Sequence, residues 1–370
     1  MPKRGLTSES PWGYPIALLW RGSVIPLILP NVLFSVAVAI GVSYFYLVVG
    51  LDIAIAGSII PSLSIVIGLI LAFRTNTAYD RFWEGRKIWT TMNTNIRNIA
   101  RVIWVGIKEK QQPDGPLLSF SAINDQKLRA INMLLAFAVA TKHHLRAEYG
   151  TSYRDLQGLL PEDFVPCKSE SNLRTQYITH RQHIRTDKND WVIQRDNSNA
   201  SMSLPLEISY QLSLWINYVK DKELIDIPYQ GQCSMALSNM IDCFGNLERI
   251  LLTPIPVAYN IHLKQILTMY CCILPFTTVR DVKWLTIPLC GAVAFTLFGI
   301  EAIGNQIEDP FGFDTNDLKL DDFCYDLMLE LDYIVQTVPQ DQSSIFGSPT
   351  TPQVPKQQQQ QQPRNILIQI

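Results

Sequence analysis

The sequence IAIAGSIIPSLSIVIGLILAF, residues 53 to 73, is followed at once by RTNTAYDRFWEGRKIW, residues 74 to 89. The first segment contains no Asp, Glu, Lys or Arg, whereas the second is rich in charge. An α-helix of about 20 apolar residues spans the roughly 30 Å hydrocarbon core of a bilayer. We therefore predict a transmembrane helix over residues 53 to 73, which leaves the membrane where the charges begin and continues into the cytoplasm as one helix.

Two rows of side chains run along this predicted helix, because residues four apart lie on the same side of a helix. The bulky row is Ile65, Leu69 and Phe73, and the small row beside it is Ser64, Gly68 and Ala72. Small side chains let helices approach closely in lipid, so the small row is interpreted as a helix-packing face. Spacing alone favours lipid contact or ordinary packing for the bulky row over the lining of a pore.

The composition indicates a membrane protein, since 47% of the 370 residues are hydrophobic and only 17% are charged. A net charge of −2 argues against a dedicated nucleic-acid binder. The seven cysteines, several within apolar segments, are interpreted as small buried side chains and not as a disulfide framework.

A second uncharged segment, residues 23 to 50, precedes the first and is long enough to span a bilayer. Only Leu51 and Asp52 separate the two segments, which predicts a tight transmembrane hairpin over residues 23 to 73. Lys and Arg flank the outer ends of this hairpin and are absent from its turn, so the positive-inside rule places the N-terminal segment, residues 1 to 22, in the cytoplasm.

The rest of the chain alternates between polar and apolar regions. Residues 74 to 255 read as a cytoplasmic helical region, with helices at 124 to 149, 206 to 219 and 231 to 252 and a polar insertion at about 150 to 203. Uncharged runs at 266 to 279 and 284 to 300 predict a second hairpin over residues 256 to 303. Each run is short for a full crossing, so one or both either use flanking apolar residues or lie inside a protein-lined bundle. A cytoplasmic segment, 304 to 337, and a disordered Gln- and Pro-rich tail, 338 to 370, follow. The predicted fold is an all-α integral membrane protein with four transmembrane helices and both termini in the cytoplasm.

The common enzyme and cofactor motifs are absent from the sequence, which has no GxxxxGK[ST], strand-linked GxGxxG, GxSxG or HExxH pattern. We therefore expect neither an enzyme nor a cofactor. The pairs His143 and His144, and His180 and His183, lack further spaced ligands and are interpreted as surface histidines.

The acidic run after residue 307 offers weak calcium candidates, Asp309, Asp314 and Asp317, next to Glu308. It lacks the spacing of known calcium loops, so a solvated surface and no metal is the favoured interpretation. Ile255 stands between Pro254 and Pro256, which fix its backbone out of a helix, and the sequence by itself favours an ordinary corner between helices.

Four short motifs agree in order and spacing with one known family. They are Trp20-Arg21-Gly22-Ser23, Phe73-Arg74 with Arg81-Phe82-Trp83-Glu84, Ile255-Pro256 with Tyr259, and Asp309-Pro310-Phe311-Gly312. Together they resemble the bestrophin family, especially its prokaryotic branch, over residues 10 to 335.

The resemblance implies a homopentameric ion channel in a plasma or inner bacterial membrane, with a central pore that passes monovalent anions such as chloride and bicarbonate. By the same resemblance, Ile65, Leu69 and Phe73 map onto the family's hydrophobic neck, and Ile255 maps onto a second constriction at the cytoplasmic exit. The continuous acidic run of animal bestrophins is interrupted here by Thr315 and Asn316, which argues against gating by calcium. A cation channel of the same architecture and a non-conducting membrane scaffold or sensor are the alternatives.

Overall fold

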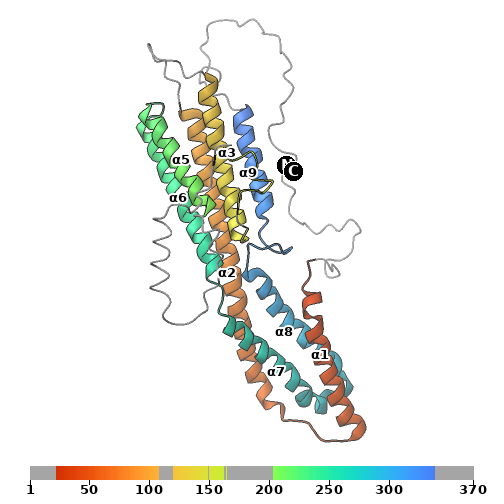
Figure 1. Cartoon of the computed structure of the whole chain (residues 1–370). Coiled ribbons are helices and arrows are strands. Elements are labelled where there is room, and N and C mark those ends of the chain that lie inside the picture. The colour runs from red at the N-terminus through yellow and green to blue at the C-terminus, as the bar shows by residue number, and fades with distance from the viewer. Residues whose placement is uncertain (1–21, 108–119, 149, 162–163, 165–202, 338–370) are drawn as a thin grey trace, which may run out of the picture. The chain divides into compact units, whose positions relative to one another are not determined.

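The computed structural model describes residues 22–107, 120–148, 150–161, 164 and 203–337, and these residues form helices and turns without any strand (Figure 1). This confirms the predicted all-α fold class. The cytoplasmic N-terminal segment up to residue 21, most of the polar insertion with His180 and His183, and the tail from residue 338 lie outside the described residues.

The described chain divides into two compact units, each made of segments distant in sequence. Among the described residues, unit 1 comprises residues 22–87 and 248–318, and unit 2 comprises those described between 88 and 247 and residues 319–337. Helix α2 (Ile60–Arg101) passes from one unit into the other as one continuous helix (Figure 1). This confirms the prediction that the apolar helix continues without a break into the charged region.

Unit 1 is a helical bundle of α1 (Ile25–Tyr44), the first part of α2, α7 (Val257–Val282) and α8 (Thr286–Glu308). Helix α1 packs along α8 and α7, which also pack on each other (Figure 1). The buried core includes Ile28 and Ala39 from α1, Ile67 and Leu71 from α2, Leu267 and Leu274 from α7, and Ala294 and Phe298 from α8. In the described chain, three helical segments are long and apolar enough to cross a membrane: Ile25–Val49, Ile60–Gly106 and Val257–Glu308.

The connection between α1 and α2 differs from the predicted two-residue turn. Helix α1 ends in a π-helical turn, Phe45–Val49, and Gly50 adopts a left-handed conformation with φ of 77°. Residues 51–56 have no regular secondary structure, and the backbone N–H of Ile55 donates to the carbonyl of Phe276 at 3.0 Å. Helix α2 therefore begins at Ile60 and not at residue 53, since Pro61 is well suited to the first turn of a helix.

Helices α7 and α8 are longer than the uncharged runs that revealed them. They contain 26 and 23 residues, which at 1.5 Å per residue corresponds to about 39 and 35 Å. Flanking residues therefore extend each short run into a helix long enough to cross, which is one of the two possibilities that the sequence left open. The polar residues Asn260 and Lys264 in α7, and Glu301 and Glu308 in α8, belong to the helices.

Unit 2 contains the end of α2, α3 (Phe120–Leu145), α5 (Leu204–Asp221), most of α6 (Ile227–Leu252) and α9 (Leu320–Thr337). Helix α3 packs against α5 and α9, and its residues 133–143 are buried without a break. Met92, Ile96, Ile99 and Ile103 recur at helical spacing, which predicts one apolar row along α2, and all four side chains are buried.

Candidate functional site

The two sides of the apolar part of α2 have opposite environments. Ile65, Leu69 and Phe73 are 73%, 56% and 61% exposed. By contrast, Ile67, Leu71 and Arg74 are 1%, 2% and 1% exposed. Residues two apart on a helix are separated by about 200°, so the exposed row faces directly away from the bundle core.

The exposed row has a regular geometry. Successive residues of the row are four positions apart, which is about 6 Å along the helix axis, and the three side chains span about 12 Å. Because the row is exposed, packing among the residues that the structure describes does not explain its bulky side chains. The remaining partners for this surface are lipid, another copy of the chain, or the lumen of a pore.

The small row beside it is only partly used within the chain. The hydroxyl of Ser64 lies 2.8 Å from the hydroxyl of Tyr270 on α7. Gly68 and Ala72 are exposed, and a Cβ added at Gly68 would meet no atom within 4 Å. Packing by Gly68 and Ala72 therefore stays a prediction that requires a helix from outside this chain.

The Pro254-Ile255-Pro256 corner connects α6 to α7 and is not helical, as the two prolines predict. The side chain of Ile255 is half-buried. Its backbone N–H donates to Oε1 of Glu308 at 3.1 Å. Since proline has no N–H, this is the only backbone N–H of the three-residue corner, and it is satisfied by a side chain from α8.

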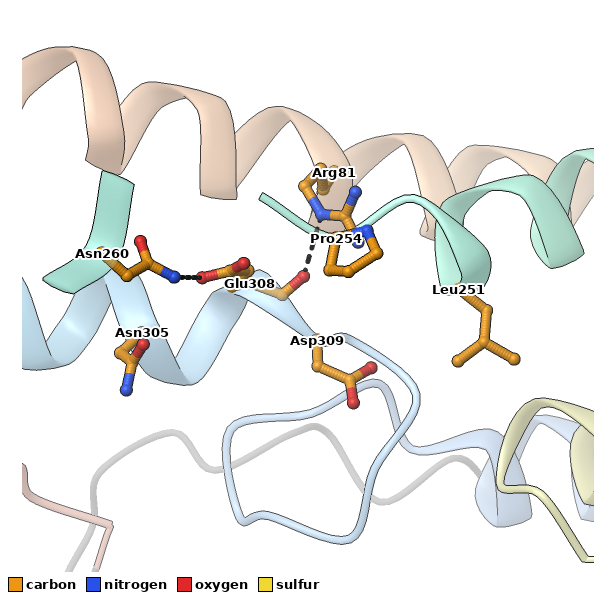
Figure 2. A pocket seen from close by; sticks show the side chains of 7 residues that line it. All are labelled: Arg81, Leu251, Pro254, Asn260, Asn305, Glu308 and Asp309. Atoms are coloured by element: carbon orange, nitrogen blue, oxygen red, sulfur yellow. Dashed lines mark hydrogen bonds between the residues drawn. The ribbon is translucent and has the colours of Figure 1, made fainter. Parts of the chain in front are cut away.

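Glu308, at the end of α8, connects this corner to α2. Its Oε2 atom accepts hydrogen bonds from Nη2 of Arg74 at 3.1 Å and from Nδ2 of Asn260 at 3.3 Å. Its backbone carbonyl accepts from Nε of Arg81 at 3.1 Å (Figure 2). Arg81 also donates to the carbonyls of Ile250 and Thr253, at 2.7 and 2.5 Å.

An open cavity of about 300 Å³ lies beside this junction. Figure 2 shows its polar lining: Arg81, Asn260, Asn305, Glu308 and Asp309, together with Leu251 and Pro254. The hydrogen bonds of Arg81, Asn260 and Glu308 in this lining join four helices, α2, α6, α7 and α8, so we interpret the cluster first as a structural junction.

The acidic loop after α8 uses two of its carboxylates for local backbone contacts. Oδ1 of Asp309 accepts from the N–H of Phe311 at 3.3 Å, and Oδ2 of the buried Asp317 accepts from the N–H of Asp314 at 2.8 Å. Within the described ranges, no group of three or more His, Cys, Asp or Glu side chains is arranged to bind a metal.

Phe311 of this loop is buried against α2. A Cβ added at Gly85 would lie only 3.1 Å from the Phe311 ring, so the absent side chain of Gly85 makes room for it. With the hydrogen bonds of Arg74 and Arg81, this contact brings together three of the short motifs identified in the sequence. They meet at the end of α8.

A charged cluster in unit 2 was not predicted from the sequence. His143 is buried, with Nε2 at 2.9 Å from Oδ1 of Asp155 and Nδ1 against Glu148, and its ring stacks on Tyr153. The interpretation of His143 as a surface histidine is therefore wrong. His144 is half-buried, and its ring contacts that of Phe244.

Lys142 completes this cluster, with Nζ 2.5 Å from Oδ2 of Asp155 and 2.7 Å from Oδ1 of Asp321. Burial alone would raise the pKa of Asp155, but the hydrogen bonds and positive charges of His143 and Lys142 outweigh it and keep the pKa well below its usual range. Burial likewise opposes the charged form of Lys142, yet its two carboxylate partners raise its pKa overall. The cluster thus ties α3 and α9 together through charge.

The fold and the exposed row of α2 together define a helical integral membrane protein. Comparison with known proteins gives the family. The model of the bacterial and fungal bestrophin proteins matches residues 6–332. The chain therefore belongs to the bacterial and fungal bestrophin family, as its motifs indicated.

Similar proteins include two from cyanobacteria. The chain is 40% identical over 334 residues to a voltage-dependent anion channel-forming protein of Synechocystis sp., covering 89% of this chain and 94% of that protein. It is 38% identical over 336 residues to a protein of the same description from Nostoc sp., covering 90% and 95%. A solved variant of a bacterial bestrophin homolog from Klebsiella pneumoniae has a TM-score of 0.63 at 24% identity and covers 84% of this chain and 99% of that one.

Proposed function

We propose that five copies of this chain form a passive anion channel, in which each copy contributes four transmembrane helices arranged in two hairpins. Both termini lie in the cytoplasm. Ile65, Leu69 and Phe73 form three stacked apolar rings around a central neck, and Ile255 forms a second constriction toward the cytoplasm. The channel conducts chloride, and bicarbonate is the second anion that we propose.

The observation that carries this proposal is the exposure of three bulky apolar side chains in register on one face of α2, while the opposite face is buried. A ring of such side chains closes a narrow passage when water leaves it and opens when water enters. Lipid contact would require only an apolar surface, whereas stacked rings require side chains at about the same depth in every copy. The four-residue spacing of Ile65, Leu69 and Phe73 supplies three such rings.

The charge of the conducted ion is proposed from the relatives, which are described as forming anion channels. The cationic residue nearest to the neck does not serve this purpose directly, because Arg74 is buried and paired with Glu308. Selectivity therefore has to come from backbone and hydroxyl dipoles near the rings, or from charges outside the neck.

A cation-conducting channel of the same architecture is the second candidate, and one side chain favours it. Asp80 is exposed and lies seven residues after Phe73, which places it on the same face of α2 and about 10 Å further along the axis. In a symmetric assembly it would form a ring of carboxylates below the neck. Such rings attract cations.

A non-conducting scaffold or sensor is the candidate from a different class, and an ion-flux measurement separates it from both channels. The purified protein is reconstituted into liposomes loaded with chloride, and chloride release is recorded with an ion-selective electrode. We expect release that scales with the protein-to-lipid ratio and is absent from protein-free liposomes. The scaffold hypothesis predicts no release of chloride, and no flux of potassium when the salt gradient across the liposome membrane is reversed.

A further inference from the structure

One carboxylate lies between the two proposed constrictions. Phe73 and Arg74 are adjacent in sequence, but their side chains leave α2 in different directions, since Phe73 is exposed and Arg74 is buried. Arg74 contacts Oε2 of Glu308, and the other oxygen of the same carboxylate accepts the N–H of Ile255. The end of the neck and the cytoplasmic constriction are thus joined through a single side chain.

We propose that Glu308 is a positioning residue, which fixes Ile255 at the cytoplasmic constriction and couples it to the neck helix through Arg74. The inference rests on the proposed function, because it needs Ile65, Leu69 and Phe73 to form the neck and Ile255 to form the second constriction. Glu308 itself does not belong to the exposed row of the neck, since it is buried and its carboxylate pairs with the buried Arg74.

The structure leaves Ile255 few other means of keeping its position. Pro254 and Pro256 fix their own φ angles but provide no N–H, so the corner has one backbone donor and one acceptor for it. Arg81 fixes the chain just before the corner through the carbonyls of Ile250 and Thr253. The hydrogen bond to Glu308 is therefore the contact that orients the peptide unit of Ile255 itself.

The buried guanidinium of Arg74 also depends on Glu308, for its counter-charge. In the part of the chain that the structure describes, Nε and Nη1 of Arg74 have no hydrogen-bond partner, and Glu308 is its only carboxylate. Asn305 supplies a neutral acceptor at 2.9 Å. A buried guanidinium that loses its counter-charge is strongly destabilising, so a shift of Glu308 toward either partner affects the other.

The test must separate this positioning role from simple loss of folding. Removing Glu308 alone would leave the charge of Arg74 buried and unpaired, so both members of the pair are neutralised together. Two variants share the Arg74→Met substitution and carry either Glu308→Gln or Glu308→Met. Gln and Met are similar in length, but only Gln offers an oxygen to the N–H of Ile255.

Each of these variants is then combined with Ile255→Ala, and unitary chloride conductance is measured in planar bilayers. In the wild type and in the Glu308→Gln background, removing the Ile255 side chain should raise the conductance by the same factor. In the Glu308→Met background, we expect that conductance ratio to fall to about 1, because coupled sites give non-additive effects. An equal ratio in both backgrounds would overturn the positioning role.

The same data distinguish a failure of this inference from a failure of the proposed function. If Ile255→Ala changes nothing in the wild type, the second constriction itself is wrong. If Ile255→Ala raises the conductance equally everywhere, the constriction stands and the role of Glu308 is wrong.

The control variant is Glu84→Gln, which removes the carboxylate of the exposed Glu84–Arg249 ion pair in the same unit. This control should leave the response to Ile255→Ala unchanged. Size-exclusion chromatography in detergent checks that every variant assembles. Amide hydrogen exchange at Ile255 gives a second readout without current, with faster exchange expected only for the Glu308→Met variant. Slow exchange in that variant would also contradict the proposal.

Discussion

Leu69 and Leu71 allow the same substitution to be made on the two faces of one helix. Leu69 is 56% exposed and belongs to the proposed neck, whereas Leu71 is 2% exposed and belongs to the core of unit 1. Leu69→Ala should change ion conduction with little effect on folding. Leu71→Ala should do the opposite, because it removes side-chain atoms from a packed interior.

The expected magnitudes follow from exposure. A buried Leu→Ala substitution costs about 2–5 kcal/mol, which is a large part of the stability of a domain. Leu69 is less than half buried, so its loss should cost about 1 kcal/mol or less. In the neck, Leu69→Ala deletes three carbons, each worth about 0.8 kcal/mol of hydrophobic free energy when fully exposed to water. Since roughly half of the surface of these carbons is exposed, the substitution lowers the cost of wetting by about 1 kcal/mol per subunit. Over five subunits this sums to about 5 kcal/mol, which corresponds to a factor of more than about 10³ in the ratio of wetted to dewetted channels.

Two assays read these effects separately. Thermal unfolding in detergent should show a lower midpoint for Leu71→Ala and a nearly unchanged one for Leu69→Ala. Single-channel recording should show a much higher open probability for Leu69→Ala, because the substitution favours the wetted, conducting state. If Leu69→Ala conducts like the wild type while it assembles normally, the rows of α2 are assigned to the wrong surroundings and the neck is not where we place it.

Two further predictions concern stability. The pKa of Asp155 is lowered in the folded state, so its contribution to the free energy of unfolding is fully present above its ordinary pKa of about 4 and is lost as the pH falls below it. Unfolding midpoints measured against pH should therefore drop in acid for the wild type and vary less for Asp155→Asn. Parallel curves for the two proteins would refute this. Gly85→Val should destabilise the chain by about 1–3 kcal/mol, because the new side chain would overlap the Phe311 ring. Gly41→Val should not destabilise it, because a Cβ added at Gly41 meets nothing within 4 Å. Equal melting temperatures for the two variants would show that Phe311 moves aside without cost.

The features that the sequence predicts best depend on local pattern. The uncharged segment from 53 to 73 predicts an apolar helix, and the row from Met92 to Ile103 predicts a buried face of the same helix. Both predictions agree with the structure, because each depends on the residues of one helix. Helix ends are predicted less well, because they depend on single residues. The start of α2 is displaced from residue 53 to Ile60, where Pro61 occupies the first turn.

The polar junctions escape the sequence for a different reason. Glu308 looks like the first member of a solvated acidic run, yet it is buried because Arg74 pairs with it from a position 234 residues away in the chain. His143 looks like a surface histidine, and its partner Asp155 lies in a turn beyond the end of its own helix. Nothing in the spacing of these residues reveals such partners, since they meet only through tertiary packing.

The short motifs, taken together, predicted more than their individual residues did. Each motif is too short to define a function, but Arg74, Arg81 and Gly85 of α2 all contact the segment from Glu308 to Phe311. Their agreement in order and spacing therefore reflects one packed junction at the end of α8. This gives a physical reason for the family resemblance that the sequence showed.

The most direct test of the central claim is the reversal potential of the purified protein in a planar bilayer under a tenfold KCl gradient. An anion channel should reverse near the chloride equilibrium potential, which has a magnitude of about 59 mV for a tenfold ratio of a monovalent ion. Reversal at the same magnitude with the opposite sign would mean that potassium is conducted and that Asp80, and not the relatives' description, indicates the selectivity. No current under any gradient, from protein that assembles normally, would contradict the channel itself.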